Sequence, residues 1–276
     1  MPKILMRLPS EVGIEIIATG DEILFGRIVD TNSSWIARRA SEVGARLRRV
    51  TCVGDDVDKI AQVLREALSR GSNFIVFTGG LGPSEDDVTI EAIGRAVDRG
   101  IERNHEAVEM LREKCAALGV ELTPLRERMA RILERSEPIP NPVGLAAGMV
   151  LREGATTIVA LPGIPEEMKA MFDGYVAPMI EEQASSKFLG KTVTVRIVWK
   201  DFFPMYGSLL RDFRDVYLKN VATPPLMAEE REKVREIEVD IVVQAPSREE
   251  CEGRMEAFLR EFRSRAEASG GQLIMR

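Results

Sequence analysis

The first 80 residues alternate short apolar runs with amphipathic helical segments, and this alternation limits the folds open to the chain. Apolar spacing predicts strands at 14–18, 45–53 and 74–77 and helices at 32–43 and 56–69. A strand–helix–strand–helix–strand order needs crossover connections, which give a mostly parallel sheet with helices on both faces. The sequence therefore predicts a three-layer, doubly wound α/β domain.

Ligands of such sheets collect at the carboxyl ends of the strands, and a glycine-rich or acidic segment follows each predicted strand. These segments are Thr19-Gly20-Asp21-Glu22, Gly54-Asp55-Asp56 and Thr78-Gly79-Gly80-Leu81-Gly82. Helix caps also favour Asp and Gly at such positions, so capping is the alternative interpretation of any one segment. Three clusters at one edge of the sheet favour a binding site.

The third segment is the most informative, because it joins glycines to carboxylates between a strand and a helix. It continues as Pro83-Ser84-Glu85-Asp86-Asp87-Val88-Thr89. Glycines let the backbone adopt positive φ and approach a ligand, and N–H groups at a helix start attract anions. Asp86 and Asp87 would repel a bare phosphate, so we expect a divalent cation between them and phosphate oxygens. The alternative is a simple turn in which Asp86 or Asp87 caps the helix.

The remaining chain is predicted to complete this domain and to add a second one. We expect helices at 90–97, 106–118 and 125–133, followed by a Pro- and Gly-rich loop at 138–148. A strand pair at 149–151 and 157–161 and a further helix at 166–182 come next. The pattern breaks near 183–186, so we place domains at 1–184 and 185–276. The second domain is predicted to be a small α+β module, KH-like or ferredoxin-like, used for packing or oligomerisation. Its strands are expected at 193–199, 237–243 and 272–275, and its helices at 205–217 and 248–268.

Composition excludes several classes of function. A net charge of −6 argues against a nucleic-acid binder, which needs a basic face. The sequence shows neither an apolar run long enough to cross a membrane nor a secretion signal, so we expect a cytoplasmic protein. His105 is the only histidine, and Cys52, Cys115 and Cys251 are widely separated. A histidine-based triad, a multi-histidine metal site and a zinc-type cysteine cluster are therefore not expected.

Five ordered motifs resemble the molybdopterin-binding (MoaB/Mog-like) domain as it occurs in the CinA family. They span about residues 13–182 and are Thr19-Gly20-Asp21-Glu22-Ile23-Leu24, Gly26 through Asp30-Thr31-Asn32, Val53-Gly54-Asp55-Asp56, Gly79 to Thr89, and Leu161-Pro162-Gly163-Ile164-Pro165. Ser84 stands where that family commonly has Thr, which keeps a hydroxyl. The chain ends where the nicotinamide-nucleotide amidase domain of full-length bacterial CinA proteins would begin, so amidase activity is not expected.

The resemblance implies a ligand with a phosphoanhydride linked to AMP. Mog-like proteins adenylylate molybdopterin, while the CinA-type domain is similar to metal-dependent pyrophosphatases that act on ADP-ribose and, in eukaryotic relatives, FAD. By this resemblance Gly79, Gly80 and Gly82 would cradle phosphates, Asp87 with Thr89 would match the family's Asp-x-Thr site, and Asp55 would match a second acidic position. The family also implies a homo-oligomer, either a dimer or a trimer.

Hydrolysis of a phosphoanhydride needs charge neutralisation on the non-bridging oxygens and a positioned water. We expect Asp86 and Asp87 to hold Mg²⁺, Mn²⁺ or Co²⁺, and Asp55, Glu22 and Asp87 to act as catalytic carboxylates. The expected partner is an adenine-nucleotide or molybdopterin-type small molecule. Its expected contacts are Gly20, Asp21, Thr78, Gly79, Gly80, Leu81, Gly82, Ser84, Thr89, Asn141, Gly144, Pro162 and Gly163. Plain loop structure is the alternative for Asn141, Gly144, Pro162 and Gly163.

Three functions stay open at this point. Pyrophosphate hydrolysis is favoured, because the doubled Asp with Pro83 fits the CinA-type loop better than the simpler Mog-type loop. Molybdopterin adenylyl transfer is the second. A pterin- or nucleotide-binding module without turnover is the third, because the same residues can bind and catalyse.

Overall fold

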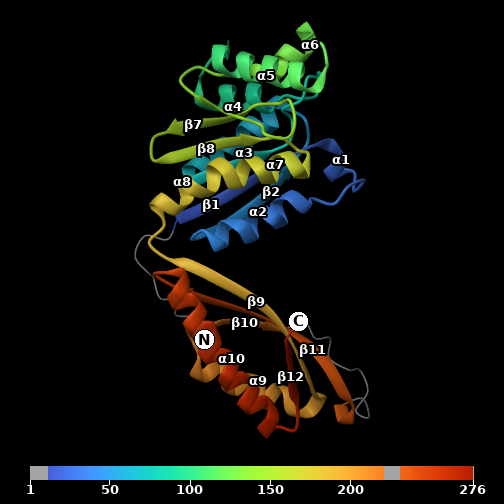
Figure 1. Cartoon of the computed structure of the whole chain (residues 1–276), viewed down its shortest axis with the longest axis vertical. Coiled ribbons are helices and arrows are strands. Elements are labelled where there is room, and N and C mark those ends of the chain that lie inside the picture. The colour runs from blue at the N-terminus through green and yellow to red at the C-terminus, as the bar shows by residue number, and fades with distance from the viewer. Residues whose placement is uncertain (1–11, 221–230, 276) are drawn as a thin grey trace. The chain divides into compact units, whose positions relative to one another are not determined.

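The computed structural model describes residues 12–220 and 231–275, and the chain divides into two compact units between Ala184 and Ser185 (Figure 1). Residues 1–11, the start of the predicted first domain, lie outside the described part. Each unit packs around its own apolar side chains, so we describe each by itself.

The described residues of the first unit form a six-stranded sheet in the order β2-β1-β3-β8-β7-β6. Its strands are β1 (Val12–Thr19), β2 (Ala45–Val53), β3 (Phe74–Thr78), β6 (Glu137–Ile139), β7 (Gly148–Glu153) and β8 (Thr156–Leu161). Strands β2, β1, β3 and β8 pair in parallel, whereas β7 runs antiparallel to both of its neighbours. The predicted mostly parallel sheet is confirmed.

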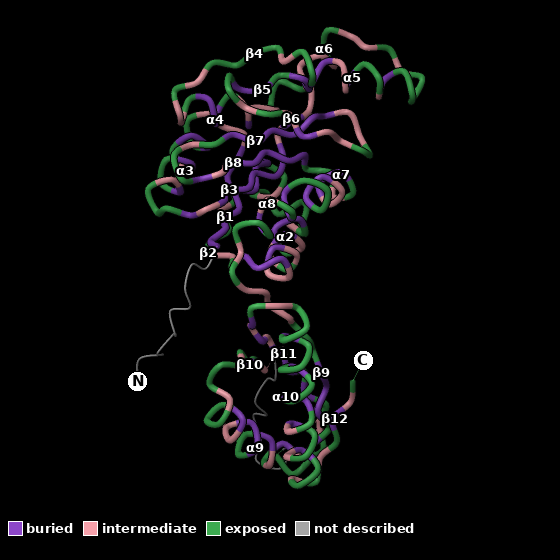
Figure 2. The backbone as a smooth tube through the Cα atoms, turned by 60° about the vertical axis from the view of Figure 1, so that its left-hand side comes forward, coloured by how far each residue is buried: buried purple, intermediate pink, exposed green. Residues whose placement is uncertain are grey.

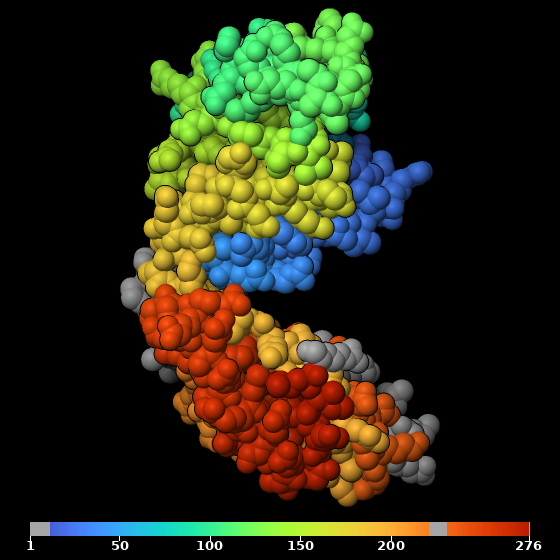
Figure 3. Space-filling view, in the orientation of Figure 1, coloured from blue at the N-terminus to red at the C-terminus, as the bar shows by residue number. Residues whose placement is uncertain are grey.

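Helices cover both faces of this sheet. On one face lie α2 (Thr31–Glu42), α7 (Pro165–Met171) and α8 (Ala177–Gln183), with the π-turn Phe172–Val176 between the last two. Figure 3 shows α2 in light blue beside α7 and α8 in yellow. The other face carries α3 (Val57–Ser69), α4 (Thr89–Val97) and α5 (His105–Leu118).

Strand side chains alternate between these two helical layers. Ile16 and Val76 join the core under α2, α7 and α8, while Ile17 and Phe77 join the core under α3, α4 and α5. Figure 2 shows the central strands in the buried colour, and β1 and β3 are buried along their whole length. A strand buried on both faces reads as a continuous apolar run, which is what the sequence shows. The predicted three-layer architecture is therefore confirmed.

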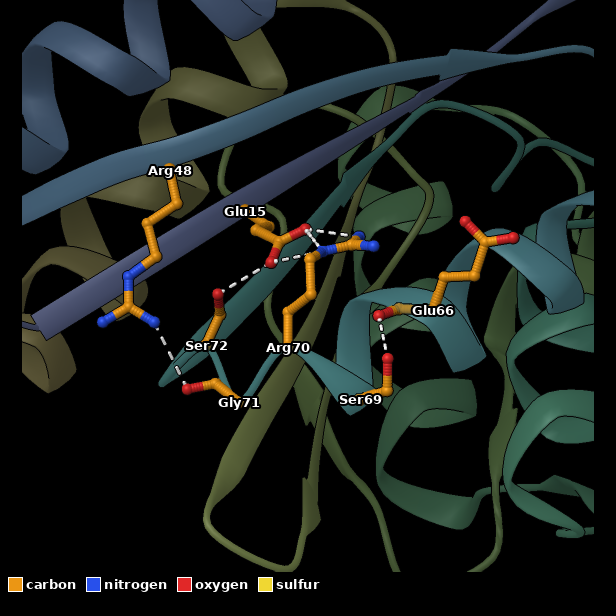
Figure 4. Close-up of polar contacts among 7 residues, drawn as sticks. All are labelled: Glu15, Arg48, Glu66, Ser69, Arg70, Gly71 and Ser72. Atoms are coloured by element: carbon orange, nitrogen blue, oxygen red, sulfur yellow. Dashed lines mark hydrogen bonds and ion pairs between the residues drawn. The ribbon is translucent and has the colours of Figure 1, made fainter.

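A buried acid near the amino end of β1 ties the sheet to the end of α3 (Figure 4). Glu15 is 2% exposed and receives hydrogen bonds from Arg70 at 2.7 Å and from Ser72 at 2.8 Å. Burial alone would raise the pKa of Glu15, but the bonds from Arg70 and Ser72 and the charge of Arg70 outweigh it and lower that pKa. A buried carboxylate needs such a partner, so this cluster is structural.

The predicted helix at 125–133 is wrong beyond its first turn. A single helical turn, α6 (Pro124–Glu127), leads through a 3₁₀ turn (Arg128–Ala130) into β5 (Arg131–Leu133). Strand β5 pairs antiparallel with β4 (Ile101–Arg103), which the sequence analysis missed. Apolar residues at helical spacing were misleading here because tertiary pairing overrode local preference. The short strand β6 inside the predicted loop was also missed, and its Pro138 is tolerated because β6 is an edge strand.

The second unit has the strand and helix order of a ferredoxin-like fold. Its elements are β9 (Lys187–Val198), α9 (Trp199–Asp212), β10 (Tyr217–Asn220), β11 (Val234–Ala245), α10 (Arg248–Ala268) and β12 (Gln272–Met275). Within residues 185–220 and 231–275 the sheet order is β10-β11-β9-β12, all antiparallel. Of the two predicted alternatives, the ferredoxin-like one is observed.

The predicted helix at 205–217 is displaced, because α9 begins six residues earlier and ends at Asp212. Trp199 and Phe202 are buried in the core and hold the early turns despite Pro204 inside the helix. The residues from Tyr217 form the missed strand β10 instead.

Candidate functional site

A cavity of about 930 Å³ opens at the carboxyl edge of the first unit's sheet. Its walls come from the loops that follow β1, β3 and β8, and Asp55, just after β2, contributes to it as well. Parallel strands carry their carboxyl ends to one edge, so loops far apart in the sequence meet here. The three strand ends that the sequence analysis grouped together are thus side by side.

Asp87 holds the loop between β3 and α4 in shape from inside. Its Oδ1 accepts the N–H of Gly82 at 2.7 Å, and its Oδ2 accepts the N–H of Ser84 at 2.8 Å. Position 82 has no room for a side chain, since an added Cβ would lie 2.5 Å from Asp87 Oδ2. Both oxygens of the carboxylate predicted for catalysis and metal binding are therefore engaged with the backbone. Each oxygen keeps a further lone pair for a cation.

The glycines of this loop do not all offer their N–H groups to a ligand. The Gly79 N–H donates to the carbonyl of Leu161, at the end of β8, at 3.1 Å. The Gly82 N–H donates to Asp87 Oδ1. Within the described part of the chain, the N–H groups of Gly80 and Leu81 make no hydrogen bond. Both residues line the cavity, so their N–H groups are the donors open to an anion.

The buried hydroxyl groups of Thr89 and Thr19 support the glycine-rich loop. Thr89 is fully buried, and its Oγ1 donates to the carbonyl of Gly79 at 2.9 Å. The same oxygen lies 3.0 Å from the Oγ1 of Thr19, at the end of β1. Thr89 is not among the residues that line the cavity. Its place in the structure is that of a support for the loop.

Asn32 lines the cavity and links the end of β3 to the loop after β8. Its Nδ2, at the start of α2, donates to Thr78 Oγ1 at 2.9 Å and to the carbonyl of Gly163 at 2.8 Å. Gly163 in turn lies against Gly79, since an added Cβ on Gly163 would be 3.4 Å from the Gly79 Cα. Asn32 therefore sets the spacing between the loops after β3 and β8.

Asp55 and Asp21 bond to each other's backbone across the ends of β1 and β2. The Asp21 N–H donates to Asp55 Oδ2 at 3.0 Å, and the Asp55 N–H donates to Asp21 Oδ1 at 3.4 Å. Burial raises the pKa of Asp55, and the charges of Asp21, Glu22 and Asp86 raise it further, against the opposing hydrogen bond from Asp21. A carboxylate whose surroundings favour proton uptake suits general-base chemistry.

Acidic side chains dominate the cavity wall. Among the described residues, six carboxylates line it: Glu22, Asp30, Asp55, Asp86, Asp87 and Glu167. Asp30 also caps α2, accepting the Ser33 N–H at 2.9 Å. Oxygen donors of this kind suit hard cations such as Mg²⁺ or Mn²⁺.

The carboxylates do not form a closed metal cage. No group of three or more acidic, histidine or cysteine side chains in the described ranges is arranged to hold a metal ion by itself. Mg²⁺ is commonly bound by one or two carboxylates together with substrate phosphates and water. The residues present therefore fit a cation that the ligand's own phosphates help to hold.

A second loop closes one side of the cavity. Asn141 Oδ1 accepts the N–H groups of Val143 and Gly144 at 3.0 and 2.8 Å, and its Nδ2 donates to Glu167 at 2.6 Å. Gly144 lies against the Glu167 carboxylate, since an added Cβ would be 2.1 Å from the Glu167 Cδ. Asn141 shapes this loop without lining the cavity, whereas Gly144 and Glu167 do line it.

Most of the predicted site residues meet in this cavity. It is lined by Gly20, Glu22, Asp55, Thr78, Gly79, Gly80, Leu81, Gly82, Ser84, Asp86, Asp87, Gly144, Pro162 and Gly163. Asp21, Thr89 and Asn141 are not among its lining residues and instead bond to the backbone of the surrounding loops.

Several further lining residues were not predicted from the sequence. Ile28, Val29 and Ile164 add apolar surface, and Val29 is 83% exposed. Arg126 adds a positive charge from α6. Asn32 lies in one of the family motifs but was not predicted as a site residue, and no local pattern marks Arg126.

The fold and the site define a three-layer α/β protein with a cavity at the carboxyl edge of a mostly parallel sheet. Residues 15–182 match the family described as probable molybdopterin binding domain. The chain belongs to this family, and the predicted resemblance is confirmed.

The chain is also similar to known proteins. A protein of Pyrobaculum calidifontis is 36% identical over 254 residues, which is 90% of this chain and 93% of that protein. A protein of Sulfurisphaera tokodaii is 34% identical over 94% of this chain and 97% of its own length. Among solved structures, the protein CinA with unknown function from Thermoplasma acidophilum is 35% identical. It covers 62% of this chain and 99% of its own, with a TM-score of 0.56.

In the part of the chain that the structure describes, none of the helices has the length and apolar character that a membrane span requires.

Proposed function

We propose that the first unit binds a phosphorylated heterocyclic ligand in the 930 Å³ cavity and hydrolyses an AMP-linked pyrophosphate of the ADP-ribose or FAD type. The observation that carries the proposal is the pairing of open backbone N–H groups at Gly80 and Leu81 with a wall of carboxylates. N–H groups favour phosphate oxygens, and carboxylates favour the cation that accompanies them.

Asp86 and the outer lone pairs of Asp87 would hold a divalent cation, Mg²⁺, Mn²⁺ or Co²⁺, and Asp55 lies among the same lining residues. When bound, such an ion neutralises charge on the non-bridging phosphate oxygens. The Gly80 and Leu81 N–H groups stabilise the charge that develops on the same phosphates as the bond breaks. Asp87 keeps the loop that presents them in its shape.

Asp55 acts as the general base in this proposal. Its raised pKa lets the carboxylate take up a proton from an attacking water, and the bond from the Asp21 N–H fixes its orientation. The water's oxygen bonds to phosphorus, the bridging phosphoanhydride bond breaks, and AMP leaves with the second phosphorylated product. Glu22 lies on the same wall and is the second candidate for orienting the water.

The test is AMP release from ADP-ribose and from FAD with each of the three cations. We expect Asp55→Asn and Asp86→Asn to reduce the rate by at least about 100-fold. Asp58→Asn is the matched control, because that carboxylate is 80% exposed on α3 and is not part of the cavity wall. Full activity in Asp55→Asn would refute the base assignment, and no AMP from either substrate would refute the hydrolytic function.

Adenylyl transfer to molybdopterin is the second candidate, favoured by the family match over residues 15–182. Incubation with ATP, Mg²⁺ and molybdopterin would then give an adenylylated pterin and pyrophosphate. If the protein binds ADP or a pterin and neither assay gives a product, a binding module without turnover is the remaining interpretation. The expected dimer or trimer stays a prediction for light scattering of the full chain.

A further inference from the structure

Arg126 enters the cavity from a segment that none of the recognised motifs covers. It lies on α6, a single helical turn that begins with Thr123 as cap and Pro124 in first position. The Arg126 N–H donates to Thr123 Oγ1 at 3.3 Å, and its Nη1 donates to the carbonyl of Glu121. These contacts hold the half-buried side chain where it lines the cavity.

The same segment lies beside the glycine-rich loop. Met129, three residues after Arg126, lines the large cavity and also a smaller one of about 60 Å³ whose wall includes Gly80, Leu81 and Gly82. Arg126 and the two open loop N–H groups therefore belong to the wall of one cavity.

The charge of Arg126 stands apart from its surroundings. Among the described residues that line the cavity it is the only basic side chain, against six carboxylates. Across the described ranges, its guanidinium makes no ion pair, and its Nε and Nη2 make no hydrogen bond. Two other arginines of this unit are ion-paired: Arg103 with Glu127 at 3.3 Å, and Arg99 with Glu153 at 2.9 Å.

We propose that Arg126 is an anion-binding residue that holds phosphate oxygens of the ligand that the cation does not hold. A guanidinium presents a planar fork of donors that matches two phosphate oxygens, and it stays charged at every working pH. A guanidinium without an ion pair, in the same cavity wall as the Gly80 and Leu81 N–H groups, completes a site for a diphosphate, with the carboxylates holding the cation. The inference rests on the proposed function only in requiring that the ligand carries a phosphate.

The experiment is titration calorimetry of the full chain with ADP and with adenosine, at constant Mg²⁺. The variants are Arg126→Ala, Arg126→Lys and, as control, Arg38→Ala, which removes an exposed charge from α2 that lines neither cavity. Arg126→Ala is expected to weaken ADP binding about 10-fold or more and to leave adenosine binding unchanged. Arg126→Lys should fall between wild type and Arg126→Ala, because it keeps the charge but loses the fork.

Three results would overturn the inference. The first is wild-type ADP affinity in Arg126→Ala, and the second is an equal loss for ADP and adenosine, which would mark a structural role. The third is no binding of ADP by the wild type at millimolar concentration. If the Arg126 dependence is found and no AMP is released from ADP-ribose or FAD, the inference survives and the proposed hydrolysis fails.

Discussion

Replacing Thr89 with Val tests whether the buried hydroxyl pair supports the glycine-rich loop. The substitution keeps the shape of the side chain and removes one hydroxyl that is 0% exposed. That hydroxyl donates to the Gly79 carbonyl at 2.9 Å and lies 3.0 Å from Thr19 Oγ1. Two hydrogen bonds are lost, and the Gly79 carbonyl loses this buried donor.

A net hydrogen bond contributes about 1 kcal/mol, and a buried group left without its partner costs about 1–3 kcal/mol. We therefore expect Thr89→Val to lower the free energy of unfolding of the first unit by about 2–3 kcal/mol. For a unit of this size that corresponds to a fall in Tm of about 5–10 °C. Binding of ADP should weaken as well, although Thr89 does not line the cavity.

Trp35 provides a fluorescence signal that belongs to the first unit. The chain has two tryptophans, Trp35 in α2 and Trp199 in α9, so a Trp199→Phe background leaves only the former. Trp35 packs edge-on to Phe172, with ring centroids 5.7 Å apart, and will report loss of that packing in urea.

Thr51→Val is the matched control, because its hydroxyl on β2 makes no hydrogen bond within the described residues. We expect it to change stability by less than about 0.5 kcal/mol. If Thr89→Val were as stable as this control, the argument that the buried hydroxyls hold the loop would be refuted.

Three further substitutions, the first with a matched control, test other contacts. Gly79→Ala should destabilise the first unit by more than about 2 kcal/mol, because position 79 has φ +109° and the added Cβ would lie 2.4 Å from a backbone oxygen. Gly174→Ala, where an added Cβ has open space, should be neutral in the same urea assay. Asp87→Asn should speed hydrogen exchange of the Gly82 amide about tenfold, since one charged acceptor is lost; unchanged exchange would contradict the bracing role. Glu15→Gln should lower the free energy of unfolding by about 1–2 kcal/mol at pH 7. This difference from wild type should shrink only as pH falls below 4.5, because the folded-state pKa of Glu15 is lowered from that value. A pH-independent difference would exclude the ion pair as its cause.

The sheet and its ligand edge were predictable because strong local patterns and global topology agree there. The runs at 14–18 and 74–77 are apolar enough to mark buried strands, and parallel crossovers then place their carboxyl ends together. The segment 125–133 shows the limit of this reasoning. Its apolar spacing fits a helix, yet pairing with β4 makes a strand of its last residues.

Side-chain roles were harder to predict than positions. The sequence marks Asp87 as a carboxylate beside glycines, but only the fold shows that both of its oxygens accept backbone N–H groups. Arg126 lines the cavity because the fold brings α6 there, and no pattern in the sequence shows this. The sequence motifs therefore predict where the cavity lies, whereas the role of each side chain in it can be assigned only from the structure.

The bracing of the glycine-rich loop by Asp87 has a consequence for the thermodynamics of ligand capture. A loop that is already tied at Gly82 and Ser84 loses little conformational freedom when a phosphate arrives, so little entropy opposes association. Association should then follow a single kinetic phase, with a rate that rises linearly with ligand concentration and shows no slow ordering step. Selectivity among phosphorylated ligands would come from dissociation rates, set by how many fixed donors each ligand can occupy at once.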